Sequence, residues 1–437
     1  MSAGDELVEE ARRRAEEVLL ANAREIGLLS ARRAYQQVNG RDAMISGLGL
    51  MLMEDPEARS THRRSMETLA SGQSRLGNIP FGVGFPDVPD ESFVATGGTF
   101  ARSKGGRDRH RPVVDTIHAG CVDNCLWYIL GHYVYQMAPG DLDFLRRFWP
   151  SLRRAYRWLQ YQDVNECGLL EVHEAMDWAD LFANRYNVLY DNVLWCGAHR
   201  AMGHLARALG DAADPYFQEA ESCRFKLNLL LWVGPEVTRD LRWVEENRTE
   251  WLYPLKRTET ELVLRPHYLP YVAFRDYAER FDVLGNLLAI VLGVASPEQA
   301  GRILDYAHQV GLDEPYPIRV LYPVVQPGEK DWRHYYWVRN LNQPHHYHNG
   351  GIWPFVGGFY VAALVGAGRH SEAERQLRRL AALNRLGKRE PWEFNEWCHG
   401  VSGRPMGFEG QSWSAAMYVY AHEAVRRGRT PFFWPQP

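Results

Sequence analysis

The sequence predicts an all-α fold in which paired helices form a toroid. Segments with apolar residues at helical spacing follow one another along the 437 residues, whereas the apolar and polar alternation that marks strands is scarce. The connecting loops are long and rich in Gly, Pro and His. In such a toroid the loops at one end surround a pocket, so residues that carry chemistry are expected just before helix starts.

The composition is that of a protein with a large core and a small, uncharged ligand. The chain has 46% hydrophobic residues and a formal charge of -4, from 50 basic and 54 acidic residues without a long basic block. We therefore expect neither nucleic acid nor a membrane as a partner. Aromatic residues make up 12% of the chain, which favours a carbohydrate ligand because sugar rings stack on aromatic faces. The oligomeric state, including any homo-oligomer, is left open.

The N-terminus and the cysteines both indicate a cytoplasmic protein. Residues 1–5 lead directly into a charged amphipathic segment, and no apolar run reaches the length of a signal core or a membrane span. The six Cys are scattered, and only Cys121 and Cys125 stand at helical spacing. Reduced, structural cysteines are expected, with neither a metal nor a cofactor.

Several predicted helices open at Ser, Asp or Pro and close at Gly. The first covers residues 6–33, where charges alternate with Ala and Leu at helical period. The others cover residues 45–53, 126–136, 145–161, 192–209, 214–232, 284–292, 297–310, 353–366, 371–386 and 412–427.

The stretch EVHEAMDWADLFANRYNVLYDNVLW, residues 171–195, is the strongest candidate for chemistry. Asp177 and Asp180 flank Trp178 and stand three residues apart, so a helix or tight turn would direct both toward one cavity. A carboxyl beside an indole in a partly dry pocket keeps its proton near neutral pH, as a general acid requires. The competing interpretation is that either Asp only caps a helix that begins near Tyr190.

Four further loops combine hydrogen-bonding groups with aromatic residues, the combination that a sugar with many hydroxyls requires. The candidate substrate-binding residues are Arg41, Asp42, Asp123, Trp127, Trp178, His348, Asn349, Trp353, Glu393, Gln411 and Trp413. His345 and His346 beside His348 could suggest a metal, but one short loop seldom supplies a tetrahedral ligand set. We interpret His348 as a partner of a sugar hydroxyl or as a loop residue bonded to the backbone.

Taken together and in order, nine motifs resemble the glycoside hydrolases built as an (α/α)6 barrel. The motifs are GRDAMISGLGLML, LGNIPF, VDNCLWYI, DWAD, NVLW, RFDVLGNLLAIVLG, HNGGIWP, NEW and QSWSAA. The resemblance is to the alkaline/neutral invertases and the amylo-α-1,6-glucosidase domain of glycogen debranching enzymes, and more loosely to mannosylglycerate and glucosylglycerate hydrolases. It implies a single barrel across residues 1–437, with residues 1–38 as an N-terminal helix.

The resemblance also implies two catalytic carboxyls, a general acid and a general base. The family's general acid falls in DWAD, where Asp180 ranks before Asp177, and its general base falls on Glu396 rather than Glu393. Two departures put the substrate in doubt: the invertases have a longer stretch after their acid, and Asn395 stands where they have Pro. Inversion by a single displacement follows, with the two carboxyls about 6.5–9.5 Å apart.

Two other classes of function remain open. One is a sugar isomerase of the N-acylglucosamine 2-epimerase type, which shares the barrel but uses paired His; the His-rich loop at residues 345–348 is its support. The other is a carbohydrate-binding barrel without catalysis. The sequence alone names neither the sugar nor the linkage, and it does not decide between hydrolysis and transfer.

Overall fold

The computed structural model describes residues 3–84, 113–114, 120–138, 140–234, 241–262 and 265–434. Six of its helices form a closed inner ring in which each helix packs on the next and the last packs on the first. In chain order they are α2 (Gly40–Leu50), α5 (Asp123–Met137), α7 (Leu189–Leu209), α11 (Val283–Val291), α13 (Pro354–Gly366) and α15 (Ser412–Arg427).

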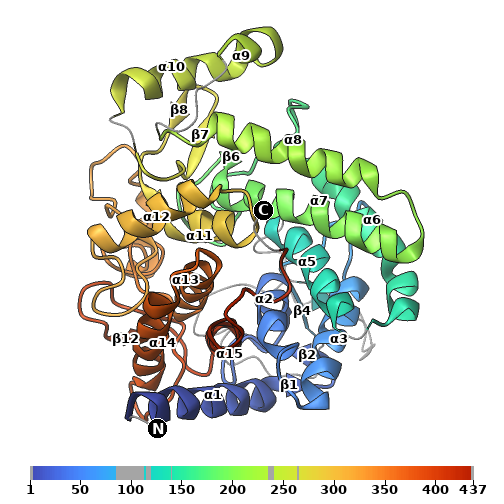
Figure 1. Ribbon diagram of the computed structural model, residues 1–437, viewed down its shortest axis with the longest axis vertical. Coiled ribbons are helices and arrows are strands. Elements are labelled where there is room, and N and C mark those ends of the chain that lie inside the picture. The colour runs from blue at the N-terminus through green and yellow to red at the C-terminus, as the bar shows by residue number, and fades with distance from the viewer. Residues whose placement is uncertain are drawn as a thin grey trace.

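A second set of helices surrounds this ring (Figure 1). The outer helices are α1 (Ala3–Asn22), α3 (Pro56–Ser71), α6 (Leu142–Gln160), α8 (Asp214–Leu230), α12 (Pro297–Gln309) and α14 (His370–Arg385). Five of them follow their inner partner directly in sequence. The sixth, α1, comes from the other end of the chain and packs on α15 and α14, so the two ends of the sequence meet there.

The inner and outer helices differ in which of their faces are buried. Every residue of α2 and α11 is buried, because an inner helix has a neighbour on all sides. Small residues allow this close approach: a Cβ on Gly49 would stand 2.3 Å from the Ala416 carbonyl oxygen of α15. In α14, by contrast, the buried positions recur every three or four residues, as on an amphipathic surface helix.

Short strands fasten the loops at the end of the barrel where the inner helices begin. β3 (Val38–Asn39), β6 (Asn187–Val188) and β9 (Phe281–Asp282) lead directly into α2, α7 and α11. Their antiparallel partners are β4 (Gly82–Gly84), β7 (Tyr271–Ala273) and β10 (Leu321–Tyr322), while β5 (Val113–Val114) pairs with β4 and β8 (Asp276–Tyr277) with β7. Two isolated hairpins pair β1 (Ala23–Arg24) with β2 (Gly27–Leu28) and β11 (Trp397–Cys398) with β12 (Pro405–Met406).

Two insertions extend the basic set of helix pairs. Between α8 and α11 lie α9 (Leu241–Asn247), the 3-10 helix η1 (Thr249–Trp251) and α10 (Leu252–Glu261), which project beside the β7–β8 hairpin at the top of Figure 1. Between β10 and α13 lies a second 3-10 helix, η2 (His334–Asn340). No helix in the described part of the chain combines the length and the apolar character needed to cross a membrane.

The all-α toroid predicted from the sequence is confirmed, and the bounds of α15 agree residue for residue. The prediction of a first helix to residue 33 was wrong, because α1 ends at Asn22 and the chain turns back through Gly27, whose φ is +121°. Helix α3 was missed although Asp55 and Pro56 mark its start: the Asp55 carboxylate accepts the Glu57 N–H. The short α9 and α10 were missed as well. The expectation of one barrel for residues 1–437 stays a prediction.

Candidate active site

The loop that joins α6 to α7 carries the first pair of candidate carboxyls. It runs from residue 161 to 188 with little regular structure, and the Val172–Tyr186 bridge closes its second half into a compact unit. Neither Asp177 nor Asp180 caps α7, since the N-cap of that helix is Val188. The helix-cap interpretation of these two residues was therefore wrong.

Asp177 faces inward and is held by its own loop. Its carboxylate accepts the Ala179 N–H at 2.8 Å and the Asn184 amide at 2.9 Å, and the residue is 1% exposed. Burial raises the pKa of Asp177 to about 6, against the effect of the Asn184 hydrogen bond. The Asp177 carboxylate therefore stabilises the turn that contains Asp180.

Asp180 has different surroundings, because its side chain is partly exposed and stands beside a buried cation. Nη2 of Arg41 lies 3.5 Å from both carboxylate oxygens of Asp180. The same guanidinium donates to Asp123 at 2.8 Å and to the carbonyl of Asp177 at 3.1 Å. Arg41, at the start of α2, therefore fixes the loop between α6 and α7, called the acid loop below after the proposed role of Asp180, against the starts of two inner helices.

The loop between α14 and α15 carries Glu396, which has no cationic partner among the hydrogen bonds and ion pairs of the described residues. Its carboxylate accepts the Tyr35 hydroxyl at 3.2 Å and the Phe408 N–H at 3.1 Å. The residue is 6% exposed. Burial raises the pKa of Glu396 to about 7, and the nearby negative charge of Asp42 adds to the rise.

Glu393, the weaker candidate for the base, has a structural role in the same loop. Its carboxylate accepts the backbone N–H groups of Lys388, Arg389 and Glu390 at 2.7–3.2 Å. Although burial raises the pKa of Glu393, these hydrogen bonds outweigh it and leave the pKa below its usual value. Glu396, rather than Glu393, therefore has the surroundings of a group that exchanges protons near neutral pH.

The two loops approach the same region although they are about 200 residues apart in sequence. The charges of Asp180 and Glu396 both raise the pKa of the buried Tyr347 hydroxyl, after the larger effect of burial. After the larger effect of burial, the charge of Asp180 also raises the pKa of Asp42, and the charge of Asp42 also raises the pKa of Glu396. Charge effects of this kind reach about one Debye length, ~8–10 Å, so Asp42 and Tyr347 lie in the neighbourhood of both Asp180 and Glu396.

Aromatic rings form one side of this region. The imidazole of His348 stacks on Trp353 at 4.9 Å with the planes 9° apart, and Trp178 meets His348 edge to face at 4.7 Å. Phe355 and Trp413 stack at 4.2 Å. Trp178 also packs edge to face on Trp353, so the indole between the two aspartates belongs to this cluster.

Several of the predicted substrate-binding residues carry buried polar atoms that have no hydrogen-bond partner in the described part of the chain. These atoms are Nε of Arg41, Oδ1 of Asp123, Nε1 of Trp178, both ring nitrogens of His348, Nε2 of Gln411 and Nε1 of Trp413. Buried polar groups are nearly always paired in folded proteins, so such a group indicates a ligand or water position. Most of these atoms are donors, which suits the oxygen atoms of a sugar.

Other predicted substrate-binding residues use their polar atoms within the protein. Trp127 donates to the hydroxyl of Tyr190, and Trp353 donates to the carbonyl of Tyr347. The Asn349 amide exchanges hydrogen bonds with both backbone groups of Val325. These side chains hold the loops and inner helices in place, so direct contact of Trp127 and Asn349 with a ligand stays a prediction.

The other two histidines of the loop lie apart from His348. His346 meets His399 edge to face at 4.9 Å, and His345 lies 6.4 Å from His399 between ring centres. His348 is 3% exposed, and burial lowers its pKa well below the usual value. The loop thus divides into a buried neutral imidazole among the aromatic rings and a separate, half-buried histidine group.

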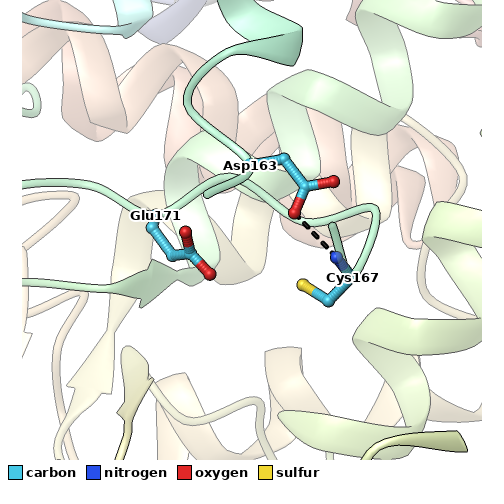
Figure 2. A group of neighbouring side chains, drawn as sticks. All are labelled: Asp163, Cys167 and Glu171. Carbon is cyan, nitrogen blue, oxygen red and sulfur yellow. Dashed lines mark hydrogen bonds between the residues drawn. The ribbon is translucent and has the colours of Figure 1, made fainter. Parts of the chain in front are cut away.

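Asp163, Cys167 and Glu171 form a cluster that a metal ion could in principle occupy (Figure 2). The Asp163 carboxylate accepts the N–H groups of Cys167 and Gly168, and Glu171 accepts the Val164 N–H. Burial raises the pKa of the Cys167 thiol to about 12. The hydrogen bonds of Asp163 and Glu171 to backbone N–H groups account for the cluster, because they stabilise the conformation of this loop.

Sequence reasoning missed Tyr35 and Tyr347, both of which adjoin the candidate carboxyls. Tyr35 has a φ of +55° and Tyr347 a φ of +43°, values that are strained for bulky residues. Left-handed residues also occur directly after Asp180, at Leu181, and two residues before Glu396, at Phe394. A strained backbone of this kind gathers at functional sites, but no local sequence motif announces it.

The C-terminal third of the chain is similar to a known sequence family. Residues 273–427 match the family model described as "Alkaline and neutral invertase". Probable alkaline/neutral invertase D of Arabidopsis thaliana is 33% identical over 147 residues, which cover 32% of this chain and 26% of that protein. Cytosolic invertase 1 of Oryza sativa subsp. japonica is 33% identical over 147 residues, covering 32% and 25%. The match therefore spans about a quarter of the length of these curated relatives.

Solved structures match over nearly the whole chain. A mannosylglycerate hydrolase of Thermus thermophilus, solved in complex with glucose, superposes with a TM-score of 0.64 at 17% identity, over 93% of this chain and 98% of its own. A bacterial glucoamylase complexed with acarbose gives a TM-score of 0.58 at 13% identity, over 98% of this chain and 56% of its own. The chain therefore has the (α/α)6-barrel fold of these glycoside hydrolases, and residues 273–427 carry the sequence pattern of the alkaline and neutral invertases.

Proposed function

We propose that this protein is an inverting glycoside hydrolase that acts on a small glycoside. The observation that carries the proposal is the approach of Asp180 and Glu396, from loops far apart in sequence, to one region lined by aromatic rings and unpaired donors. The invertase match and the fold of the mannosylglycerate hydrolase support the same class of activity. The isomerase alternative is not favoured, since His348 is separated from the other two histidines of its loop.

In the proposed mechanism Asp180 protonates the glycosidic oxygen while Glu396 takes a proton from the attacking water. A single displacement needs room for that water, so the carboxyls should stand about 6.5–9.5 Å apart across the sugar. The backbone N–H of Phe408 and the hydroxyl of Tyr35 hold Glu396, and a base with a pKa of about 7 is ionised in neutral and alkaline solution. This agrees with the neutral and alkaline character in the relatives' names.

A second assignment exchanges the two roles. The raised pKa of Glu396 is typical of a general acid, and the Arg41 guanidinium beside Asp180 favours a charged carboxylate there. The family resemblance supports the first assignment, whereas the local electrostatics support the second. An experiment that removes the need for acid catalysis separates them.

The test compares Asp180→Asn and Glu396→Gln on two substrates, sucrose and α-D-glucosyl fluoride. Fluoride leaves without full protonation, so loss of the acid should harm sucrose hydrolysis by about 10²–10⁴-fold while fluoride turnover stays within about tenfold. Loss of the base should harm both substrates. If Glu396→Gln is the variant that retains fluoride turnover, the exchanged assignment is correct.

The choice of sugar and the stereochemistry form the finer part of the proposal. A panel of sucrose, short α-glucosides, mannosylglycerate and glucosylglycerate, assayed by release of the free sugar, identifies the substrate. Proton NMR of the new sugar before mutarotation should show inversion at the anomeric carbon. Initial retention would contradict a single displacement, and binding without turnover across the panel would favour a carbohydrate-binding barrel.

A further inference from the structure

The acid loop is held from outside by residues 331–342, a segment that includes η2 and that the proposed mechanism does not use. This segment comes from between β10 and α13, more than 150 residues further along the chain. Its contacts fall on both sides of Asp180. Because the loop itself has little regular structure, these contacts add to those of Arg41 and Asp177 in holding the backbone around Asp180.

Tyr336 makes the central contacts. Its ring stacks on Phe182 with the centres 5.1 Å apart and the planes 8° apart, and its hydroxyl accepts the Ala183 N–H at 3.1 Å. Tyr336 is fully buried. Two and three residues after Asp180, the loop is therefore fixed by both a ring stack and a backbone hydrogen bond.

Two further contacts complete the support. The Asn342 amide donates to the carbonyl of Leu181 at 2.9 Å, and Leu181 is the left-handed residue directly after Asp180. On the other side, the Glu174 carboxylate accepts hydrogen bonds from Nε and Nη2 of Arg333, at 2.9 and 3.1 Å. It also accepts one from the Tyr335 hydroxyl at 2.7 Å. Leu181 would relax from its strained conformation if these contacts were lost, and Asp180 would move with it.

We infer that Tyr336 is a positioning residue for Asp180, and that residues 331–342 set the orientation of this carboxyl toward the glycosidic bond. The expected kinetic effect rests on the proposed function. A small displacement of a proton-transferring group lowers the rate of the chemical step much more than it weakens substrate binding. The contacts with the loop exist whatever the substrate is.

The test is a double-mutant cycle with Tyr336→Phe, which keeps the ring stack but removes the oxygen that accepts the Ala183 N–H. In the wild-type background we expect kcat for sucrose, or for the best substrate of the panel, to fall by about 5–20-fold with KM changed by less than about twofold. In the Asp180→Asn background the same substitution should cost less than about twofold, since there is no longer a carboxyl to position. Equal losses in the two backgrounds would overturn the inference.

Tyr420→Phe is the matched control. Tyr420 is equally buried and loses one hydrogen bond, to the Pro431 carbonyl, and among the contacts of the described residues it neither bonds to nor stacks on residues 161–188. Its kcat should equal that of wild type even if its melting temperature falls as much as that of Tyr336→Phe. A parallel loss of kcat in both variants would reduce Tyr336 to a general structural role.

A second measurement does not depend on turnover. Hydrogen–deuterium exchange of peptides that cover residues 177–187 should be faster in Tyr336→Phe than in wild type, while peptides from α15 are unchanged. Unchanged exchange of the 177–187 peptides would overturn the inference. If no glycoside of the panel is hydrolysed by wild type but this exchange difference appears, the proposed function fails and the positioning contact stands.

Discussion

Two glutamates, one in the loop before α15 and one in its last turns, are both little exposed but have opposite acid–base properties. Glu396, in the loop before the helix, is 6% exposed, and Glu423, in its last turns, is 4% exposed. The pKa of Glu396 is raised to about 7, whereas that of Glu423 is lowered to about 2. Burial alone therefore does not decide the chemistry of a carboxyl; its partners do.

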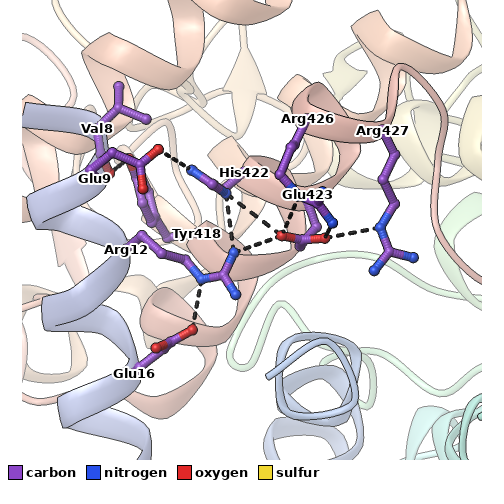
Figure 3. Close-up of polar contacts among 9 residues, drawn as sticks. All are labelled: Val8, Glu9, Arg12, Glu16, Tyr418, His422, Glu423, Arg426 and Arg427. Atoms are coloured by element: carbon purple, nitrogen blue, oxygen red, sulfur yellow. Dashed lines mark hydrogen bonds and ion pairs between the residues drawn. The ribbon is translucent and has the colours of Figure 1, made fainter. Parts of the chain in front are cut away.

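The partners of Glu423 are three arginines. Arg426 and Arg427 of the same helix and Arg12 of α1 all bond to its carboxylate at 2.7–3.0 Å (Figure 3). Burial alone would raise the pKa of Glu423, but these hydrogen bonds and charges outweigh it. Because Arg12 belongs to the N-terminal helix, this cluster fastens the two ends of the chain together.

Glu396 has one hydroxyl and one backbone N–H in place of three cations. Its charged form is poorly compensated, which costs stability but leaves the carboxyl able to exchange a proton near neutral pH. The comparison thus contrasts a carboxyl arranged for chemistry with one arranged for stability. Three predictions test whether that distinction is real.

The largest effect is expected from Glu396→Gln. Turnover of the natural substrate should fall by about 10²–10⁴-fold because a proton-transferring group is lost. The same substitution should increase the free energy of unfolding, although it decreases activity. The native pKa of about 7 lies above the usual 4.5, so the carboxyl's contribution is fully present below about pH 4.5 and is lost as the pH rises through about 7.

At pH 8 the Gln variant should accordingly be more stable than wild type, by about 1–3 kcal/mol, as often follows when a poorly compensated active-site charge is removed. Urea denaturation at pH 8 and at pH 5 measures the difference, which should shrink at the lower pH. A variant that loses both activity and stability at pH 8 would show that Glu396 is a structural group.

Glu423→Gln should reverse this pattern. The free energy of unfolding at pH 7 should fall by about 1–3 kcal/mol, because three guanidinium groups lose their common acceptor. Since the native pKa is below 4.5, this stabilisation is present above about pH 4.5 and is lost as the pH falls toward about 2. The kcat and KM of the folded variant should match wild type, and a tenfold loss of kcat would break the comparison.

The smallest effect is expected from Tyr35→Phe, which removes the hydroxyl that donates to Glu396. That hydrogen bond favours the charged carboxylate, so its loss should raise the pKa of Glu396 further. With Glu396 as base, kcat/KM of wild type should rise with pH through about 7, and this limb should move up by about 0.5–1 pH unit in the variant. A limb that does not move would mean that another group controls it.

The accuracy of the sequence predictions followed the strength of local signals. The bounds of α15 and the start of α8 were predicted correctly, because Ser412, Asp214 and Pro215 mark helix starts and Gly428 stands at a helix end. The N-terminal helix was predicted eleven residues too long, since residues 23–33 keep a helical pattern while the chain turns at Gly27 to place α1 against α15. Local patterns do not record such packing requirements.

The same limit applies to the candidate site. DWAD marked the loop that carries both aspartates, but only the structure shows their different surroundings: Asp177 is bonded to Ala179 and Asn184, and Asp180 lies beside Arg41. Nothing in the sequence around Tyr336 connects it to that loop, because a ring stack and a hydrogen bond to a backbone N–H require no complementary motif.

The sequence by itself determined the toroid of helices and the motifs at their starts, because helical periodicity and capping are local properties of the chain. Only the tertiary structure decided the hydrogen-bond partners and the pKa of each carboxyl. Tyr35 reaches Glu396 from 361 residues away, and Arg12 reaches Glu423 from 411 residues away. The free energy of a buried charge depends on the groups that surround it in space, and folding alone brings those groups together.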